Sequence, residues 1–277
     1  MMARRTVHTG KTRVWRHGRM QAGTRAIPDE TPVAISYNGS SQAVMMATPA
    51  DLEDFAIGFS LSEGVIGQAA EIDSLEIVPH DDGVELRMWL AGDVAERLQQ
   101  RRRHIAGPTG CGLCGVDSIA EAVRPVATVG AGRSFSPQQI IAAIEALPPL
   151  QKLNVETRAV HAAAYFTPEQ GIQHVREDVG RHNALDKLVG ALARDRIDAA
   201  NGIVLLTSRV SVEMVQKTAA IGAAVLVAVS APTALAVRMA EAAGITLAAI
   251  ARSDGFEIFT HPQRIVEIDH KGAADVA

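Results

Sequence analysis

The 277-residue sequence has only two cysteines, Cys111 and Cys114, and both fall in one nine-residue stretch. A structural zinc site needs about four ligands, and neither a second cysteine pair nor histidines at metal-ligand spacing accompany these two. An intrachain zinc site is therefore disfavoured, although a site shared between two chains stays open. The sequence also lacks the apolar run of a signal peptide and any uninterrupted apolar run that could cross a bilayer, so we expect a cytoplasmic protein with reduced thiols.

Acidic residues are absent from residues 1–28, which contain seven Lys+Arg. Because the whole chain has 27 Lys+Arg and 31 Asp+Glu, residues 29–277 have 20 and 31, a net charge of −11. A basic segment without an apolar pattern is typical of a disordered tail. We therefore expect residues 1–29 to form a disordered basic arm, with anion binding as the alternative. The 47% hydrophobic content is ample for a core in one large or two modest domains.

The stretch 107–115, Gly-Pro-Thr-Gly-Cys-Gly-Leu-Cys-Gly, places glycine on both sides of Cys111 and directly after Cys114. Four glycines and a proline disfavour a regular helix or strand, so this stretch predicts an exposed loop that presents two thiols. Besides zinc, three interpretations remain: a thioredoxin-type dithiol, a pair of small buried side chains, and a sulfur carrier that holds a persulfide. The basic run 101–104 just upstream is either a solvated helix end or a patch that lowers the pKa of a thiol.

Residues 30–135 predict an α+β domain that carries the cysteine loop at its end. Asn38-Gly39 separates two weakly alternating runs, which is typical of a β-hairpin. Thr48 and Pro49 favour the start of a helix that ends near Glu63-Gly64. The other predicted elements are strands at 72–78 and 84–89 and a basic helix at 93–104.

Residues 136–277 predict an α/β domain, because apolar strands alternate with helices at the spacing of a mostly parallel sheet. Two runs, 203–206 and 224–229, are apolar on both faces, as expected of strands covered on two sides. The predicted strands are 171–175, 203–207, 224–230, 245–250 and 256–260, and the predicted helices are 136–147, 183–194, 211–221 and 232–243.

Polar residues follow three of these strands, at 207–209, 230–233 and 252–255. Ligands bind past the strand ends of such sheets, where free backbone N–H groups favour a phosphate, and Arg209 and Arg252 would add contacts. Ordinary helix capping explains each end taken alone, but three together favour a binding cleft. The dense ionisable run 176–183 is either a salt-bridged turn with an asparagine cap or one wall of a site.

Five motifs together resemble the FdhD family of formate dehydrogenase accessory sulfurtransferases, over roughly residues 30–262. They are Gly110 to Gly115 (GCGLCG), Thr48 to Phe59 (TPADLEDFAIGF), Arg176 to Leu188 (REDVGRHNALDKL), Ser208 to Met214 (SRVSVEM) and Ser230 to Thr233 (SAPT). The resemblance implies a sulfurtransferase that accepts persulfide sulfur from a cysteine desulfurase. It implies that the sulfur goes to the molybdenum of bis-molybdopterin guanine dinucleotide, the cofactor of formate dehydrogenase.

By position, the resemblance makes Cys111 the persulfide-bearing residue and Cys114 its nearby partner. It assigns cofactor binding to Ile250, Ala251, Arg252, Ser253, Asp254 and Gly255. A guanine nucleotide is the expected surrogate ligand. The resemblance further implies a homodimer, with cysteine desulfurase and formate dehydrogenase as partners and with no nucleic acid or membrane.

The same resemblance implies a three-layer α/β/α fold similar to cytidine deaminases in residues 136–277. The zinc elements of those enzymes are missing, because His161 is not followed by the glutamate of H-x-E and residues 207–211 contain no cysteine. Ile250 also departs from the aromatic residue usual in the family, and Arg158-Ala159 stand where Gly-Gly is usual. No resident metal is expected. The rival functions are a cofactor chaperone, which would bind nucleotide without forming a persulfide, and a dithiol oxidoreductase, which would cycle a disulfide without nucleotide affinity.

Overall fold

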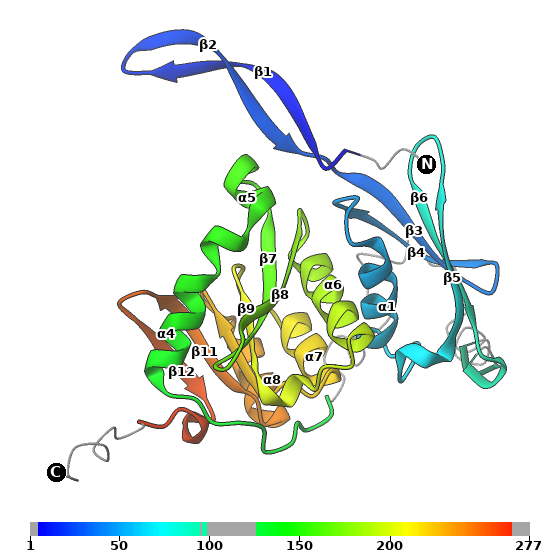
Figure 1. Cartoon of the computed structure of the whole chain (residues 1–277), viewed down its shortest axis with the longest axis vertical. Helices are drawn as coiled ribbons and strands as arrows, with labels where there is room; N and C mark the ends of the chain where they lie inside the picture. The colour runs from blue at the N-terminus through cyan, green and yellow to red at the C-terminus, as the bar shows by residue number, and fades with distance from the viewer. Residues whose placement is uncertain (1–4, 95, 99–125, 268–277) are drawn as a thin grey trace. The chain divides into compact units, whose positions relative to one another are not determined.

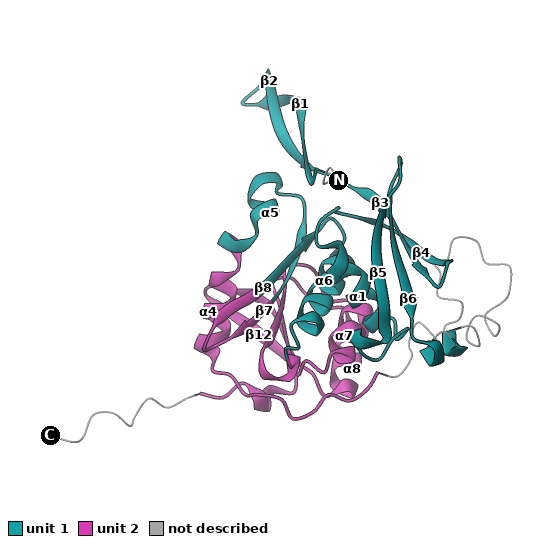
Figure 2. Cartoon of the chain, turned by 45° about the vertical axis from the view of Figure 1, so that its right-hand side comes forward, with its two compact units in different colours: residues 1–125, 149–164, 174–197 teal, residues 126–148, 165–173, 198–277 magenta. Residues whose placement is uncertain are grey.

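The computed structural model of the chain describes residues 5–94, 96–98 and 126–267 (Figure 1). The cysteine loop 107–115 and most of the predicted helix 93–104 lie outside the described residues. The chain forms two compact units, coloured separately in Figure 2. Unit 1 comprises residues 1–125, 149–164 and 174–197, and unit 2 comprises residues 126–148, 165–173 and 198–277. These units are not the continuous stretches 30–135 and 136–277 that the sequence predicted.

Unit 1 contains a four-stranded sheet in the order β4-β3-β6-β5. The sequence prediction of a hairpin at Asn38-Gly39 is confirmed, because the strands on its two sides pair antiparallel and both turn residues have positive φ. The inner face of the sheet packs on one helix, and large side chains such as Phe55 and Leu86 are completely buried in this core. The elements are β3 (Thr31–Tyr37), β4 (Ser40–Ala47), α1 (Leu52–Ser62), β5 (Ile72–Pro79) and β6 (Val84–Leu90).

The start of α1 differs from the sequence prediction. The helix begins at Leu52 after Asp51, whose φ of 51° lies in the left-handed region, and not at Thr48-Pro49. The groups of Thr48 are used elsewhere, because its N–H donates to Asp178 at 3.0 Å and its hydroxyl accepts the N–H of Val179 at 3.1 Å. These contacts hold the Thr48 backbone out of the helix.

A second helix, α6 (Arg181–Arg194), belongs to unit 1 because its backbone lies directly against α1. A glycine on each helix allows this approach. A Cβ atom on Gly58 would overlap the carbonyl oxygen of Asp186, and one on Gly190 would overlap that of Asp54. The close packing of these two helices, which are far apart in the sequence, explains why unit 1 is discontinuous.

The N-terminal arm also differs from its prediction. Residues expected to be disordered form a hairpin of β1 (Val7–Arg16) and β2 (Arg19–Pro28), paired antiparallel along both strands. At its root the guanidinium of Arg25 donates to the carbonyl of Thr157, 3.1 Å away, in the short helix α5 (Lys152–Thr157). The backbone pairing of the two strands and the Arg25 contact hold this segment in place. The sequence did not predict a folded element here because the segment has too few buried apolar side chains.

The second sheet has six strands in the order β12-β11-β10-β9-β7-β8. The prediction of parallel strands is confirmed for β9, β10 and β11, while the edge strand β12 is antiparallel to β11. β9 and β10 are buried at every position, as their continuous apolar runs predicted. The strands are β7 (His161–Thr167), β8 (Gly171–Asp178), β9 (Ile203–Leu206), β10 (Val225–Ala228), β11 (Thr246–Arg252) and β12 (Gly255–Thr260).

Unit 2 contains the end of β7, the start of β8, the other four strands and three helices, at the positions predicted for the helices. They are α4 (Pro137–Ala146), α7 (Val212–Ala220) and α8 (Ala234–Ala243). Ser136 caps α4 in a reciprocal capping box with Gln139, and Thr233 caps α8 by accepting the N–H of Ala236. The structure therefore shows a mixed α/β protein.

Candidate functional site at the strand ends of unit 2

The three polar strand ends predicted as a cleft lie at one edge of the sheet in unit 2. Parallel pairing of β9, β10 and β11 brings their carboxyl ends to the same side. Backbone hydrogen bonds join the following loops: the N–H of Val210 donates to Ala231, and the N–H of Thr233 donates to Val210 at 3.0 Å. The N–H of Ile250 donates to Ser230 at 3.3 Å, which attaches the third segment to the second. The sequence prediction that these segments converge is confirmed.

The predicted cofactor segment, 250–255, forms the end of β11 and its turn into β12. A β-bulge interrupts the pairing between Ala249 and Arg252, and Ile250 in this bulge has a φ of 55°. The left-handed region is unfavourable for a β-branched residue, so the backbone here is strained. The side chain of Ile250 is 41% exposed whereas Ala251 is fully buried. The bulge therefore presents an apolar side chain at the polar edge.

Arg252 lies across the end of the neighbouring strand. Its guanidinium donates to the carbonyl of Val229, which follows β10, and to the carbonyl of Ala251 at 2.8 Å. The next residues, Ser253 and Asp254, are exposed in the turn. The segment thus offers a fixed cation, a hydroxyl, a carboxylate and backbone N–H groups within six residues. This set matches the donors and acceptors on a guanine edge and a phosphate.

Helix capping, the alternative explanation of these polar ends, accounts for part of them. Thr233 is a true cap, whereas Ser211 precedes α7 without a side-chain cap hydrogen bond and contacts Glu213 at 2.6 Å. Ser208 is nearly buried and donates to the carbonyl of Arg209 at 3.0 Å. Arg209 itself is exposed at this edge. Capping therefore explains only one of the three ends, the segment 230–233.

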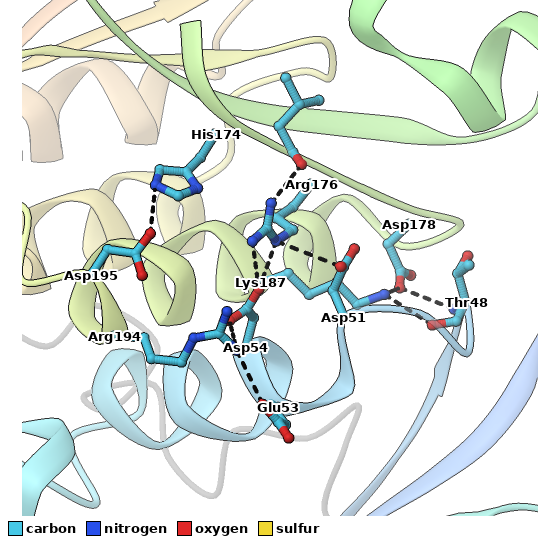
Figure 3. Close-up of polar contacts among 11 residues, drawn as sticks. Thr48, Asp51, Glu53, Asp54, His174, Arg176, Asp178, Lys187, Arg194 and Asp195 are labelled. Atoms are coloured by element: carbon cyan, nitrogen blue, oxygen red, sulfur yellow. Dashed lines mark hydrogen bonds and ion pairs between the residues drawn. The ribbon is translucent and has the colours of Figure 1, made fainter. Parts of the chain in front are cut away.

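The ionisable run 176–183 lies in unit 1, where it stabilises the packing of α1, β8 and α6 (Figure 3). The carboxylate of Asp178 accepts hydrogen bonds from the Thr48 N–H, the Lys187 ammonium at 2.6 Å and the Asn183 amide at 3.0 Å. Asn183 was predicted as a helix cap, but it lies inside α6 and Gly180 holds the cap position. The saturated hydrogen bonding of Asp178 supports the salt-bridged interpretation of this run.

A second part of the same network surrounds Asp54 on α1. Its carboxylate, 3% exposed, contacts Arg176 at 2.7 Å and Arg194 at 3.1 Å. Arg194 also reaches Glu53 at 3.1 Å. These pairs join the first turn of α1 to the last turn of α6 and to β8. The sequence motifs around 48–59 and 176–188 therefore meet in one structural network, which the linear sequence did not reveal.

His161, the counterpart of the deaminase zinc ligand, is the first residue of β7. Burial lowers its pKa below the ordinary histidine value, and the nearby Arg181 lowers it further. A neutral imidazole is therefore favoured at neutral pH. Among residues 5–94, 96–98 and 126–267, no group of three or more His, Cys, Asp or Glu has the arrangement of a metal site.

Arg264 is a buried cation that sequence reasoning missed. Its guanidinium donates to the carbonyls of Ala131 at 2.5 Å, Gly244 at 2.8 Å and Gly130 at 3.1 Å. Burial lowers the pKa of Arg264, but its donors are matched by carbonyl oxygens. The contacts fix residues 130–131 in unit 2. The only sequence signal was a lone arginine near the end of the apolar pattern.

The fold and the edge described above define an α/β protein with a candidate nucleotide-binding site at its strand ends. The chain belongs to the FdhD/NarQ family, which matches residues 28–266. It is 54% identical over 252 residues to the sulfur carrier protein FdhD of Agrobacterium fabrum, covering 91% of this chain and 93% of that one. It is 51% identical over 251 residues to the protein of the same name from Cupriavidus necator, covering 91% and 87%.

A solved structure from Desulfotalea psychrophila, described as a formate dehydrogenase accessory protein, has a similar fold. The TM-score is 0.75 at 26% identity, and the match covers 95% of this chain and all of that one. Family membership confirms the resemblance drawn from the five motifs. None of the helices that the structure describes is long and apolar enough to cross a membrane.

Proposed function

We propose that this protein is a sulfur carrier that supplies sulfur to the molybdenum cofactor of a formate dehydrogenase. The observation that carries the proposal is the convergence of three polar strand ends in unit 2, because the third contains the segment 250–255 that the family resemblance assigns to the cofactor. The names of the relatives, sulfur carrier proteins and a formate dehydrogenase accessory protein, support the same role. Bis-molybdopterin guanine dinucleotide is the proposed acceptor and a cysteine desulfurase is the proposed donor.

In the first proposed step, the Cys111 thiolate attacks the terminal sulfur of the desulfurase persulfide. The new S–S bond forms on Cys111, and the desulfurase cysteine leaves as a thiolate. In the second step, the Cys114 thiolate attacks the Cys111 sulfur and releases hydrosulfide to the acceptor. The two cysteines are then a disulfide, which an external dithiol must reduce before another cycle.

The acceptor would be held through its guanine dinucleotide part in the deaminase-like α/β region. The Asp254 carboxylate would accept the N1–H and amino protons of guanine, and Arg252, Ser253 and the Gly255 N–H would contact polar groups of the dinucleotide. Ile250 and Ala251 would set the shape of the edge. The scaffold thus supplies recognition while the cysteines carry the sulfur. We also propose that the protein works as a homodimer in the cytoplasm.

Transfer of radiolabelled sulfur from cysteine, in the presence of a desulfurase, tests the proposal. Cys111→Ala should lose the label, whereas Cys114→Ala should keep it because the first step needs only Cys111. Asp254→Asn should weaken guanosine diphosphate binding about tenfold while leaving labelling intact, since one charge-assisted contact is worth roughly 1.5 kcal/mol.

Equal labelling of Cys111→Ala and the parent would exclude the carrier role. Nucleotide binding without any label would favour a cofactor chaperone, and rapid disulfide cycling without nucleotide affinity would favour an oxidoreductase.

A further inference from the structure

The β1–β2 hairpin lies almost entirely outside the family match, which begins at residue 28. Figure 1 draws it as the blue two-stranded ribbon. Within the described residues, β1 and β2 pair only with each other, so the outer edge of each strand is unpaired. A two-stranded ribbon is marginally stable alone in water. Ten-residue strands extend about 33 Å, so the hairpin tip can reach a separate molecule.

The tip combines apolar and cationic side chains. Trp15 and Met20 lie directly opposite each other and are 65% and 54% exposed. Arg16 and Arg19 form the next cross-strand pair, and like charges directly opposite each other destabilise a hairpin. Exposed tryptophan, methionine and arginine are the residues enriched at the centres of protein interfaces. The tip therefore has the composition of a contact surface for an anionic partner.

One face of the hairpin extends this surface. Lys11, Arg13 and Trp15 alternate along β1 and therefore share a face. Residues 5–28 contain six Lys+Arg and no Asp or Glu. The only long-range side-chain contact described for the arm is at its root, from Arg25 to Thr157 in α5. The cations of the tip thus lie far from the contact that holds the arm.

A complementary surface exists on the same chain at β5. Residues 71–85 contain six Asp+Glu and no Lys or Arg, and among them Asp73, Glu76 and Asp82 are exposed. β5 is an edge strand, because the sheet order is β4-β3-β6-β5. Glu85, in contrast, is already engaged by Ser36 at 2.6 Å and Arg87 at 2.8 Å, which lower its pKa. Glu76 is also paired, with Arg87 at 3.7 Å. Asp73 and Asp82 are therefore the exposed carboxylates that this edge offers to a cationic partner.

We propose that the hairpin tip of one chain docks on the acidic β5 edge, residues 71–82, of a second copy. Trp15 and Met20 would provide the apolar contact, Lys11 and Arg13 on the same face would meet the carboxylates, and Arg16 and Arg19 would add positive charge beside the turn. The unpaired edges of the hairpin and of β5 also permit backbone pairing between the two chains. Charge complementarity favours this occupant, because the chain beyond the arm has a net charge of −11.

Carbodiimide coupling tests the contact, because this reagent joins an amine to a carboxylate only when the two are in direct contact. Lys11 is the only lysine of residues 1–28, so its cross-links report the arm. Full-length protein is prepared with natural and with heavy nitrogen, mixed, coupled and analysed by mass spectrometry. We expect cross-links of Lys11 to peptides of residues 71–82 that contain one light and one heavy partner. Cross-linked pairs in which both peptides always carry the same isotope would show contacts within one chain and would overturn the proposal. Cross-links of Lys11 only to carboxylates outside residues 71–82 would also overturn it.

Charge reversal provides the second test. Arg16→Glu with Arg19→Glu should weaken self-association about tenfold at low salt, and Asp73→Lys with Asp82→Lys should do the same. Mixing the two double variants should restore both contacts of the mixed dimer, because one joins two unchanged surfaces and the other joins two charge-reversed surfaces. Glu145→Lys with Glu257→Lys is the matched control, because both residues are exposed and lie elsewhere. Sedimentation velocity that finds the same association for all three variants would show that the dimer, if formed, does not use the arm.

Discussion

The ammonium of Lys187 donates a 2.6 Å hydrogen bond to the carboxylate of Asp178, and both side chains are completely buried. Lys187 also donates to the carbonyl of Thr48 at 2.9 Å, so the pair joins α6 to the segment before α1. Removing one partner leaves a buried charge without compensation, which costs about 3–5 kcal/mol. The Lys187–Asp178 pair is therefore important for the stability of unit 1, because it connects α6 to the segment before α1.

We predict that Lys187→Met lowers the free energy of unfolding by about 3–5 kcal/mol, measured by urea denaturation. Adding Asp178→Asn should recover at least about 1 kcal/mol of this loss, because the uncompensated carboxylate is then neutral. Additive losses in the double variant would show that the two side chains are not coupled.

The two glycines between α1 and α6 give a second prediction. Gly190→Ala should cost about 3 kcal/mol or prevent folding, because the added methyl group overlaps the backbone of Asp54. Gly67→Ala is the matched control, since its nearest neighbour to a new Cβ, a Glu71 oxygen, is 3.7 Å away. Thermal unfolding measures both. Similar melting temperatures for the two variants would contradict the close helix packing.

The partly buried carboxyl group of Glu177 should make the free energy of unfolding depend on pH. Burial raises the pKa of its carboxyl, although hydrogen bonds from the Leu153 and Asn154 N–H groups oppose this effect. The folded protein therefore keeps this proton to a higher pH than the unfolded chain does. The free energy of unfolding should fall as the pH rises through the folded pKa.

Replacing Glu177 with Gln removes the titration and keeps an acceptor for α5. Urea denaturation from about pH 4 to pH 7 should show the parent losing stability relative to Glu177→Gln as the pH rises. A constant difference between the two proteins across this range would contradict the prediction.

The strained bulge at the candidate site gives a fourth prediction. Ile250→Gly should raise the stability by up to about 1 kcal/mol, because glycine adopts positive φ without strain. Ala251→Gly, a buried position with ordinary backbone, should lower it. Thermal unfolding compares the two. A loss of stability in Ile250→Gly as large as that of Ala251→Gly would show that residue 250 carries no strain.

Short sequence patterns predicted those elements that depend mainly on residues close together in the chain. Asn38-Gly39 identified the β3–β4 hairpin, and the continuous apolar runs identified β9 and β10. Their polar ends predicted the edge in unit 2, because parallel strands necessarily end together. The segment 250–255 was placed at this edge from sequence, although its bulge and the left-handed Ile250 were not foreseen.

Features that depend on distant partners were not predictable. Thr48 has the properties of a helix cap, but its backbone N–H donates a hydrogen bond to the carboxylate of Asp178, 130 residues away. Alanines dominate β7, so its sequence had no clear strand pattern even though the strand is buried. The arm was expected to be disordered because its hairpin depends on backbone pairing and a single root contact rather than on apolar burial.

The most direct test of the proposed function is mass spectrometry of the peptide that contains Cys111 after treatment with a desulfurase and cysteine. The measurement is made with and without guanosine diphosphate, using Cys111→Ala as the blank. We predict that the Cys111 peptide gains the mass of one sulfur atom, which a reducing agent removes. An unmodified Cys111 peptide, with the desulfurase demonstrably charged with sulfur, would contradict the account.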